Sequence, residues 1–348
     1  MSILHPFGNL TPNEYSSTWI APSNIAFVKY WGKKGHQLPA NPSLSMTLKE
    51  CVTKSKVSFA PSESLSVKLQ LDGKEQEKFA SKIHAYLETL KSDLPWLSQV
   101  NVNIETSNTF PHGAGIASSA SGMAAIALAL TDYAHQLAKL PHDDLFYKRA
   151  SYLARLGSGS ACRSLYGGFT SWGESELADS TDKYATRFEV HPDLAHLQDT
   201  VLVISDEEKN VSSRAGHGQM TEHAFAESRY VQAKKNYTLM LSALKAGDMD
   251  QVGEILESEA LSLHAMMLTS PNPYTLFKPN TLKAMEMIWD FRHQTKLPLY
   301  FTLDAGPNLH LIYPEIFKNK IHTFISHELA PLSLKLIDDQ RGEGPVQC

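Results

Sequence analysis

The chain has 348 residues, which at roughly 100 to 200 residues per domain predicts two domains. Hydrophobic residues make up 42% and charged residues 20%, which is typical of a soluble globular protein and not of a disordered or collagen-like chain. With 32 Lys and Arg against 37 Asp and Glu, the net charge of -5 argues against a broad basic surface for nucleic acid or anionic membrane. Any bound phosphate must therefore be held by a local site.

The cysteines and the N-terminal segment predict a cytoplasmic protein. Cys51, Cys162 and Cys348 are too scattered for a disulfide framework or a cysteine-rich zinc site and suit a reducing compartment. The first eight residues have neither a basic start nor an apolar core of signal-peptide length. Residues 106–131 lack Asp, Glu, Lys and Arg, but only 123–130 are continuously apolar, well short of the roughly 20 residues that span a bilayer. A buried, alanine-rich helix is expected there.

Hydrophobic periodicity gives the elements of the first half in chain order. Residues 21–33 contain an apolar run that predicts a strand, and alternation over 56–74 predicts two short strands that end in a turn at Asp72-Gly73. Helical spacing over 79–90 and alternation over 100–104 predict a helix and then a strand. A loop rich in Pro and Gly follows, and a helix is expected from Ser118.

A polar segment around 191–198 separates this half from a predicted strand at 200–204, so we expect domains at 1–195 and 196–348. The second half contains long segments in which apolar residues recur at helical spacing, and short runs of apolar residues. They predict helices at 221–244, 248–267 and 279–291 and strands at 299–303, 309–313 and 332–337. Because the helices cluster and do not alternate strictly with strands, the predicted fold class is α+β, with helices on one face of mostly antiparallel sheets.

The segment from Pro111 to Gly122 combines glycines with paired serines at the expected start of a helix. The backbone N–H groups of such a loop, together with the helix dipole, can hold a phosphate group. The ending of a Walker loop and the GxGxxG turn of a dinucleotide fold are both missing. Taken alone, the segment fits equally well a helix that small residues allow to pack closely.

A second glycine-flanked segment, Gly157 to Ser164, places hydroxyl groups and the guanidinium group of Arg163 on a tight turn. This arrangement suits two-bond recognition of a carboxylate or phosphate, and a polar turn with a surface arginine is the alternative. Cys162 lies in the same turn, but no histidine partner for a nucleophile is indicated. A small buried thiol is therefore expected.

Lys29 and Asp304 each have a simple structural explanation. A lysine that ends a strand usually extends its ammonium group into water. An aspartate between an apolar strand and a Gly-Pro turn, as at Asp304, commonly forms the turn. Neither residue indicates catalysis when it is considered alone.

Together, these segments resemble the diphosphomevalonate decarboxylase family of the GHMP kinase superfamily. The matching motifs occur in the family's order from about residue 21 to 313: Ser23-Asn-Ile-Ala, Lys29-Tyr-Trp-Gly-Lys, Asn41-Pro-Ser-Leu-Ser, Ala114-Gly-Ile-Ala-Ser-Ser-Ala, Gly157-Ser-Gly-Ser-Ala-Cys-Arg-Ser-Leu-Tyr-Gly-Gly and Asp304-Ala-Gly-Pro-Asn. The resemblance implies a two-domain GHMP kinase fold, with an N-terminal domain like ribosomal protein S5 domain 2 and the active site in the cleft before a GHMP C-terminal domain. It also implies conversion of (R)-5-diphosphomevalonate and ATP, with Mg²⁺, to isopentenyl diphosphate, ADP, phosphate and CO₂.

The resemblance also implies a role for each matching residue. Asp304 resembles the catalytic acid at the substrate's 3-hydroxyl group, and Lys29 is expected to lie close to it and hold it ionised. Arg163, helped by Ser158, resembles the group that binds the substrate carboxylate. The other expected binding residues are Tyr30, Lys33, Ser160, Ser213 and Arg214 for the substrate, and Gly113, Ala114, Gly115, Ile116, Ala117, Ser118 and Ser119 for the ATP phosphates.

The chain departs from the family pattern at a few places. Pro42 replaces a common serine, and His112 stands where a small polar residue is usual. The match over 206–217 is loose, so Ser213 and Arg214 are assigned from a short Ser-Arg-x-Gly pattern. Two histidine pairs that are among the nearest in sequence, His217 with His223 and His191 with His196, lack the spacing of zinc ligands, so surface histidines are predicted.

Alternatives to the implied reaction remain open at this point. One is a GHMP small-molecule kinase that stops at the phosphorylated product, or a decarboxylase that acts on 5-phosphomevalonate. Another is a ligand sensor without turnover. Relatives suggest a homodimer in isoprenoid supply, and Mg²⁺ would be carried mainly by the ATP phosphates. No nucleic-acid or membrane partner is expected.

Overall fold

The computed structural model describes residues 3–4, 7–8, 10–111, 115–207 and 211–348. Its larger sheet is eight-stranded, with the order β14-β1-β4-β7-β5-β6 and with β8 and β9 attached beside β4. The strands are β1 (Tyr15–Val28), β4 (Ser43–Pro61), β5 (Ser66–Leu71), β6 (Lys74–Glu75), β7 (Val100–Asn108), β8 (Phe169–Trp172), β9 (Thr186–Phe188) and β14 (Val346–Gln347). A separate small hairpin pairs β2 (Lys33–Lys34) with β3 (Leu38–Pro39).

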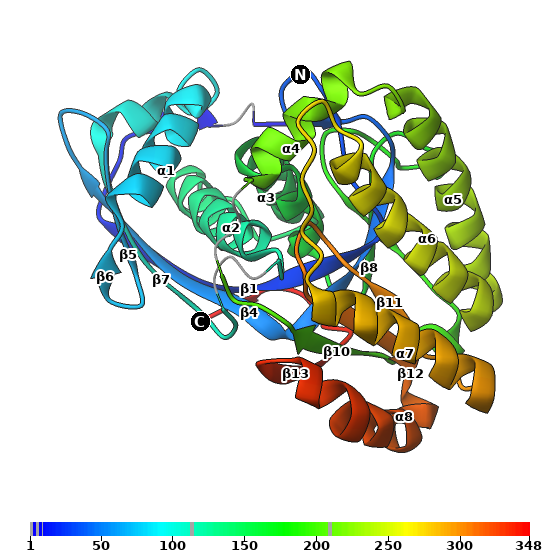
Figure 1. Ribbon diagram of the computed structural model, residues 1–348. Coiled ribbons are helices and arrows are strands. Elements are labelled where there is room, and N and C mark those ends of the chain that lie inside the picture. Colours follow the sequence, from blue (N-terminus) through cyan, green and yellow to red (C-terminus); the bar gives the residue numbers. More distant parts are fainter. Residues whose placement is uncertain (1–2, 5–6, 9, 112–114, 208–210) are drawn as a thin grey trace.

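Helices α1 (Glu77–Leu90), α2 (Ser118–Ala138) and α3 (Asp144–Gly157) lie on one face of this sheet (Figure 1). Alanines of α2 are fully buried, because their small side chains let the helix pack closely against β1 and β4. The predicted buried, alanine-rich helix is therefore confirmed, and it begins at Ser118 as expected. Among the described residues, no helix combines the length and apolar character needed to cross a membrane.

The second sheet is four-stranded, antiparallel, and ordered β11-β12-β10-β13. Its strands are β10 (Leu197–Val203), β11 (Tyr300–Thr302), β12 (Leu309–Pro314) and β13 (Lys335–Gln340). The helices of this half are α4 (Ser213–Gln219), α5 (Ala226–Ala246), α6 (Met249–Leu268), α7 (Pro279–Thr295) and α8 (Lys318–Phe324). One sheet face packs against α6, α7 and α8 through a cluster that includes Phe301 and Leu311. Layers of this kind confirm the predicted α+β class.

The other face of the second sheet joins the first sheet in a shared apolar core. Phe27 and Met46 of the first sheet pack in one cluster with Val201 and Ile312 of the second. For this reason the last part of β1, residues 21–28, is buried on both faces. A strand that ends between two sheets places its next residues in the interior, which is where the functional site lies.

Some elements differ from the predictions. The strand expected at the start of 56–74 is the end of the long β4, whose first residues do not alternate because both faces are buried. β5 pairs in parallel with β7, since α1 connects them as a crossover. The helix predicted at 221–244 begins only at Ala226, β13 begins at Lys335 and not at 332, and α4 and α8 were not predicted.

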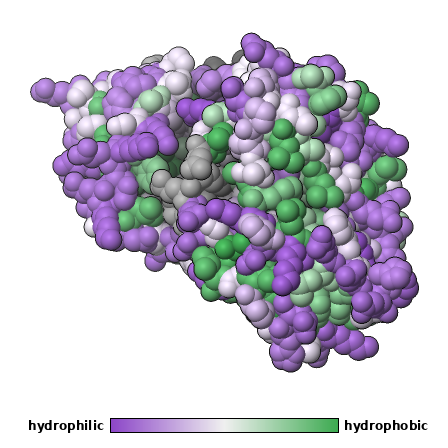
Figure 2. Space-filling view, in the orientation of Figure 1, coloured by the Kyte–Doolittle hydropathy of each residue, from purple (hydrophilic) through white to green (hydrophobic). Residues whose placement is uncertain are grey.

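The polar surface agrees with the composition. Figure 2 shows hydrophilic residues over much of the visible face, with hydrophobic residues gathered over α6. The last residues return to the first sheet, where β14 pairs with β1 and Arg341 bridges to Leu48. The first sheet therefore contains strands from both ends of the chain.

Candidate active site

Lys29 and Asp304 form an ion pair where the two halves of the chain meet. β1 ends at Val28, and Lys29 places its Nζ 2.9 Å from Asp304 Oδ1 and 2.7 Å from the carbonyl oxygen of Ala26. The Lys29 side chain is only 1% exposed, while that of Asp304 is 25% exposed. The alternative in which this lysine extends into water is therefore wrong. The two side chains meet, as the resemblance implied, and their catalytic roles stay predictions.

The charges around this pair favour an ionised carboxylate. Burial would raise the pKa of Asp304, but the charge and hydrogen bond of Lys29, with the charges of His310 and Arg163, bring that pKa below its ordinary value. Burial lowers the pKa of Lys29, and the negative charges of Asp304 and Glu259 oppose this effect. A partly open carboxylate held by a buried ammonium group can accept a hydrogen bond from a bound hydroxyl group.

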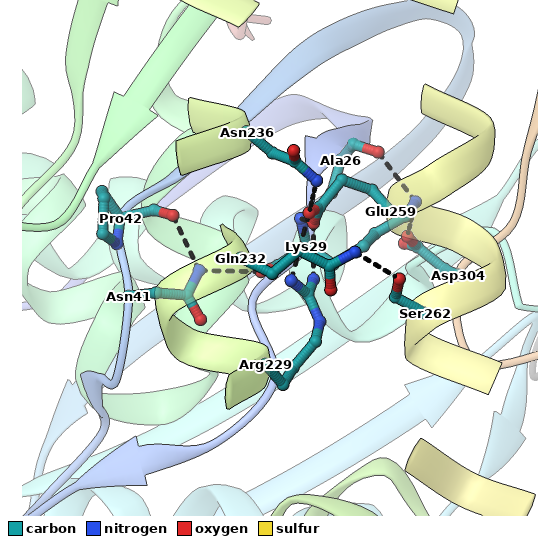
Figure 3. A network of polar contacts seen from close by, with 10 residues as sticks. All are labelled: Ala26, Lys29, Asn41, Pro42, Arg229, Gln232, Asn236, Glu259, Ser262 and Asp304. Atoms are coloured by element: carbon teal, nitrogen blue, oxygen red, sulfur yellow. Dashed lines mark hydrogen bonds and ion pairs between the residues drawn. The ribbon is translucent and has the colours of Figure 1, made fainter. Parts of the chain in front are cut away.

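The backbone of Lys29 is fixed by a buried carboxylate from the second half of the chain. Glu259 on α6 accepts the backbone N–H of Lys29 at 2.9 Å through Oε2. Arg229 on α5 donates from Nη1 to Glu259 Oε1 at 3.1 Å and from Nη2 to Oε2, and Asn236 Nδ2 donates to Oε1 at 2.8 Å. Figure 3 shows these side chains converging on Glu259 beside Lys29. Side chains of two helices, α5 and α6, thus hold Lys29, the residue that follows β1.

Asn41 holds the carbonyl side of the same residue. Its Nδ2 donates to the carbonyl oxygens of Lys29 at 3.0 Å and Pro42 at 2.8 Å (Figure 3). Both backbone polar groups of Lys29 are therefore used, which restricts where its side chain can lie. Sequence reasoning gave Asn41 no role, although it begins the Asn-Pro-Ser-Leu-Ser motif. Glu259 carried no sequence signal at all.

Arg163 is buried close to this pair, in the 3₁₀ segment Gly159–Leu165. Its Nη1 donates to Ser43 Oγ at 2.8 Å and its Nε donates to Ser45 Oγ at 3.0 Å. These hydrogen bonds go to neutral hydroxyl groups of β4, and the role of Ser158 in binding the substrate carboxylate stays a prediction. Ser43 and Ser45 alternate along β4 and so share one face, a signal that the sequence did contain.

The surroundings of Arg163 suit an anionic ligand. Burial lowers the pKa of Arg163, and the negative charge of Asp304 opposes this effect. A buried guanidinium group without a bonded carboxylate is costly, so a ligand carboxylate would be bound favourably here. The alternative of a surface arginine is wrong. Cys162 beside it is a buried thiol, as predicted, and burial raises its pKa to about 12.

Tyr30 and Lys33 follow Lys29 along the chain, and both are half-buried. The ring of Tyr30 packs against Trp172, with centroids 4.7 Å apart, and its buried hydroxyl group has no hydrogen-bond partner within the described part of the chain. Burial lowers the pKa of Lys33, and the nearby positive charge of Arg214 lowers it further. The structure thus brings Lys33 and Arg214 together.

The predicted serines have different surroundings. Ser158 and Ser160 are half-buried at the start of the 3₁₀ segment that contains Arg163. Ser213 is exposed at the first turn of α4. Tyr30 contacts this segment closely, since a Cβ built on Gly159 would lie 2.8 Å from its ring. The predicted substrate residues therefore come from three separated parts of the chain.

His217 corrects the prediction of surface histidines. It is buried, packs at a tilt against the rings of Tyr30 and Trp31 with centroids 4.5 Å apart in each case, and accepts the backbone N–H of Gly32 at 3.0 Å. Burial, with the charge of Lys33, lowers its pKa to about 3, so the ring is neutral. His223 is also buried. Within the described residues, no group of three or more His, Cys, Asp or Glu side chains could hold a metal ion.

The predicted phosphate loop leads into α2. Gly113 and Ala114 lie outside the described residues, as does His112. Gly115 has φ +85° and Ala117 has φ +48°, so the chain turns sharply before the helix. Ile116 has a buried side chain, and its carbonyl oxygen accepts from Ser23 Oγ at 2.6 Å. Ser118 is half-buried and Ser119 is exposed.

This loop has the features that a phosphate group requires. Among the described residues, no side chain caps the amino end of α2, so the N–H groups of its first turn can face a ligand. A Cβ built on Gly115 would lie 3.3 Å from Gly306 Cα, which places the loop against the turn that follows Asp304. The loop, Asp304 and Lys29 therefore border one site.

Two domain patterns match the chain in succession. The pattern described as "Diphosphomevalonate decarboxylase-like N-terminal domain" matches residues 21–185, and that described as "Mevalonate 5-diphosphate decarboxylase C-terminal domain" matches residues 200–341. The diphosphomevalonate decarboxylase of Candida albicans is 33% identical over 321 residues, which are 88% of this chain and 86% of that protein. The Saccharomyces cerevisiae enzyme is 32% identical, with coverage of 89% and 81%.

Solved structures agree with these sequence matches. The mevalonate diphosphate decarboxylase from Staphylococcus aureus has a TM-score of 0.83 at 30% identity, with 96% of this chain and 98% of that chain covered. MDDEF in complex with MVAPP, AMPPCP and magnesium has a TM-score of 0.83 at 31% identity, with coverage of 96% and 99%. Both likenesses extend over the site described above.

Proposed function

This chain belongs to the diphosphomevalonate decarboxylase family, and from that premise we propose that it converts (R)-5-diphosphomevalonate and ATP to isopentenyl diphosphate, ADP, phosphate and CO₂. The observation that carries the proposal is the 2.9 Å contact between Lys29 and Asp304 beside the buried guanidinium of Arg163. A related protein, MDDEF, is described in complex with MVAPP, AMPPCP and magnesium. The reaction supplies C5 isoprenoid units through the mevalonate pathway.

Asp304 is the group at the 3-hydroxyl of the substrate. Because its pKa lies below the ordinary value, this carboxylate is a weak base, and it serves better to orient the hydroxyl group than to remove its proton fully. The oriented oxygen forms a bond to the γ-phosphorus of ATP, the bond from that phosphorus to ADP breaks, and the hydroxyl proton passes to a phosphate oxygen or to solvent. Phosphoryl transfer needs mainly such positioning and charge stabilisation.

Arg163 binds the substrate carboxylate. Its planar group is held by Ser43 and Ser45 and remains free to form further hydrogen bonds to a carboxylate. In the second step, the C–O bond to the new phosphate group breaks, and the C–C bond to the carboxylate supplies the electrons of the double bond. CO₂ and phosphate leave together with isopentenyl diphosphate.

Tyr30, Lys33, Ser213 and Arg214 bind the diphosphate end, with Ser158 and Ser160 near the carboxylate end. The hydroxyl group of Tyr30 is buried and unpartnered among the described residues, and the positive charge of Arg214 contributes to the lowered pKa of Lys33. Neutral His217 shapes this pocket by packing against Tyr30 and adds no charge. The binding energy of the diphosphate therefore comes from the lysine, the arginine and hydroxyl groups.

The ATP phosphates bind the backbone of Gly113, Ala114, Gly115, Ile116 and Ala117, with Ser118 and Ser119 at the start of α2. An uncapped helix end and left-handed backbone at Gly115 and Ala117 fit such a ligand. Mg²⁺, when bound, neutralises phosphate charge and is carried mainly by the nucleotide. Asp304 and Lys29 then lie within reach of the γ-phosphate.

A substrate panel tests the reaction. We expect ADP and CO₂ in equal amounts from 5-diphosphomevalonate with ATP and Mg²⁺, and little product from 5-phosphomevalonate or mevalonate. ADP without CO₂ would mean a GHMP small-molecule kinase, and preference for 5-phosphomevalonate would mean a monophosphate decarboxylase. Nucleotide binding without any turnover would mean a ligand sensor.

We also propose domains at 1–195 and 196–348, a cytoplasmic location and a homodimer. The match to the first family pattern ends at 185 and the match to the second begins at 200, which supports a boundary between them. β14 is the exception, since it belongs to the second segment but pairs with β1. Sedimentation of the purified protein would test the dimer, and limited proteolysis between 185 and 200 would test the boundary.

A further inference from the structure

A second buried acid–base pair lies behind Asp304. His310 Nδ1 is 2.7 Å from Asp199 Oδ2, and the two side chains are 1% and 0% exposed. His310 Nε2, Asp199 Oδ1 and the hydroxyl group of Thr302 have no hydrogen-bond partner among the described residues. Burying such groups is costly, and the mechanism above uses none of them.

Strand register directs this pair toward the reacting carboxylate. His310 on β12 stands opposite Thr302 on β11 and Val201 on β10. Asp304 follows Thr302 along the chain, and the intervening Leu303 packs into the apolar cluster on the other sheet face. Since side chains alternate along a strand, Asp304 leaves β11 on the face that carries His310.

Few charged groups act on this part of the interior. They come from several elements: Lys29, Arg163, Glu259 and Asp304 on the side of the substrate, and Asp339 with Cys51 on the far side of Asp199. Asp339 accepts the backbone N–H groups of Lys49 at 2.8 Å, Glu50 at 2.9 Å and Cys51 at 2.8 Å. Its charge is thus already stabilised, which leaves the Asp199 carboxylate as the counter-ion of His310.

His310 acts on the pKa of two buried carboxylates. Burial raises the pKa of Asp199, and the charge and hydrogen bond of His310 oppose this effect. Burial likewise acts to raise the pKa of Asp304, and the charges of Lys29 and then His310 overcome it. A positive charge on His310 would therefore favour the ionised form of both carboxylates.

We propose that His310, held by Asp199, is a positioning residue for the decarboxylation. Its imidazolium group keeps Asp304 in the carboxylate form, which can accept a hydrogen bond from the 3-hydroxyl group of the substrate. Lys29 acts from the front of the carboxylate and His310 from behind. When ATP and the substrate bring several negative charges next to Lys29, the charge on His310 remains to stabilise Asp304. This role rests on the proposed decarboxylation of 5-diphosphomevalonate.

The test compares pH profiles of kcat/KM for CO₂ release. His310→Asn keeps an N–H group for Asp199 and removes the positive charge. Loss of this cation raises the pKa of Asp304, so the acid limb of the kcat/KM profile should move to higher pH. For a rise of one unit in that pKa, kcat/KM on the acid limb should fall about tenfold. Above pH 8 the activity should approach that of the wild type. Asp199→Asn should move the limb in the same direction, because it removes the counter-ion of His310.

His322→Gln is the matched control. His322 Nε2 is 3.1 Å from Asp338 Oδ1 in an exposed pair on α8 and β13, away from Asp304. This variant should keep the wild-type profile. A uniform loss at every pH in His310→Asn, or an unchanged profile, would overturn the role of His310 even if CO₂ release by the wild type upholds the proposed function.

A second measurement needs no active variant. In wild-type protein labelled with ¹⁵N-histidine, the resonance assigned to His310 at pH 6 should show both ring nitrogens protonated. A neutral ring at pH 6 would overturn the proposal. This result would stand whether or not the wild type releases CO₂, so the two proposals can fail separately.

Discussion

The backbone N–H of Lys29 donates to the side chain of Glu259 at 2.9 Å, and the same lysine reaches Asp304 with its ammonium group. Glu259 lies on α6 and Lys29 directly follows β1, so this hydrogen bond joins the two halves of the chain at the reacting centre. Arg229 and Asn236 hold Glu259 from α5. The geometry of the ion pair thus depends on contacts from the two helices α5 and α6.

Asp304→Asn should reduce turnover by about 10²-fold or more and leave ATP affinity nearly unchanged, because Asp304 acts mainly in the transition state. The measurements are CO₂ release and the Kd for ATP. Asp193→Asn changes an acid whose side chain is 80% exposed and should be silent. Near wild-type turnover in Asp304→Asn would remove this residue from the mechanism.

Arg163→Lys should lower kcat/KM for 5-diphosphomevalonate at least about tenfold, because a hydrogen bond to a charged group contributes roughly 1.5–3 kcal/mol. Lysine keeps the charge but cannot bond Ser43, Ser45 and a carboxylate in one plane. Steady-state kinetics with varied substrate measure the effect. Arg187→Lys, at an exposed position on β9, is the control. Full activity of Arg163→Lys would mean that the group is only a nearby charge.

Glu259→Gln should destabilise the fold by about 3–5 kcal/mol, because it leaves Arg229 as an uncompensated buried charge. Urea unfolding measures the loss. Glu207→Gln removes a carboxylate that pairs with Lys278 at an exposed site, and it should cost no more than about 1 kcal/mol. Equal effects of the two variants would contradict the structural importance of Glu259.

The Asp304 carboxylate should also make stability depend on pH. Its pKa is lower in the folded protein than the unfolded value of about 3.9. The ionised group therefore stabilises the fold fully above that value, and the contribution is lost as the pH falls through the folded pKa. The difference in unfolding free energy between wild type and Asp304→Asn should be constant from pH 5 to 7 and shrink below pH 4. A constant difference down to pH 3 would contradict the shift.

Local patterns predicted the parts of the site that lie on regular elements. Hydrophobic periodicity and the positions of Gly and Pro predict the apolar run before Lys29, the helix from Ser118 and the turn at Asp304. The structure contains all three elements. The family resemblance was needed to connect them, because nothing in the spacing says that residue 29 meets residue 304. Contacts between distant segments depend on how sheets pack.

The missed residues show the same limit. Glu259 and Arg229 stand on ordinary amphipathic helices, where a charged residue predicts a solvated face, yet both are buried. His217 was expected at the surface and is enclosed by Tyr30 and Trp31. Only Ser43 and Ser45, alternating on β4, offered a pattern that could have been followed.

The return of β14 to the edge of β1 has a consequence for biosynthesis. While the chain emerges from the ribosome, the first sheet can form β1 and β4 early, but its edge stays uncovered until residue 346 has been made. The apolar stretch 21–28 likewise waits for the second sheet that buries its other face. A nascent N-terminal half would therefore expose an unpaired strand edge and an apolar face. Both features promote aggregation, so we expect chaperones to bind this half until β14 and the second sheet have been made.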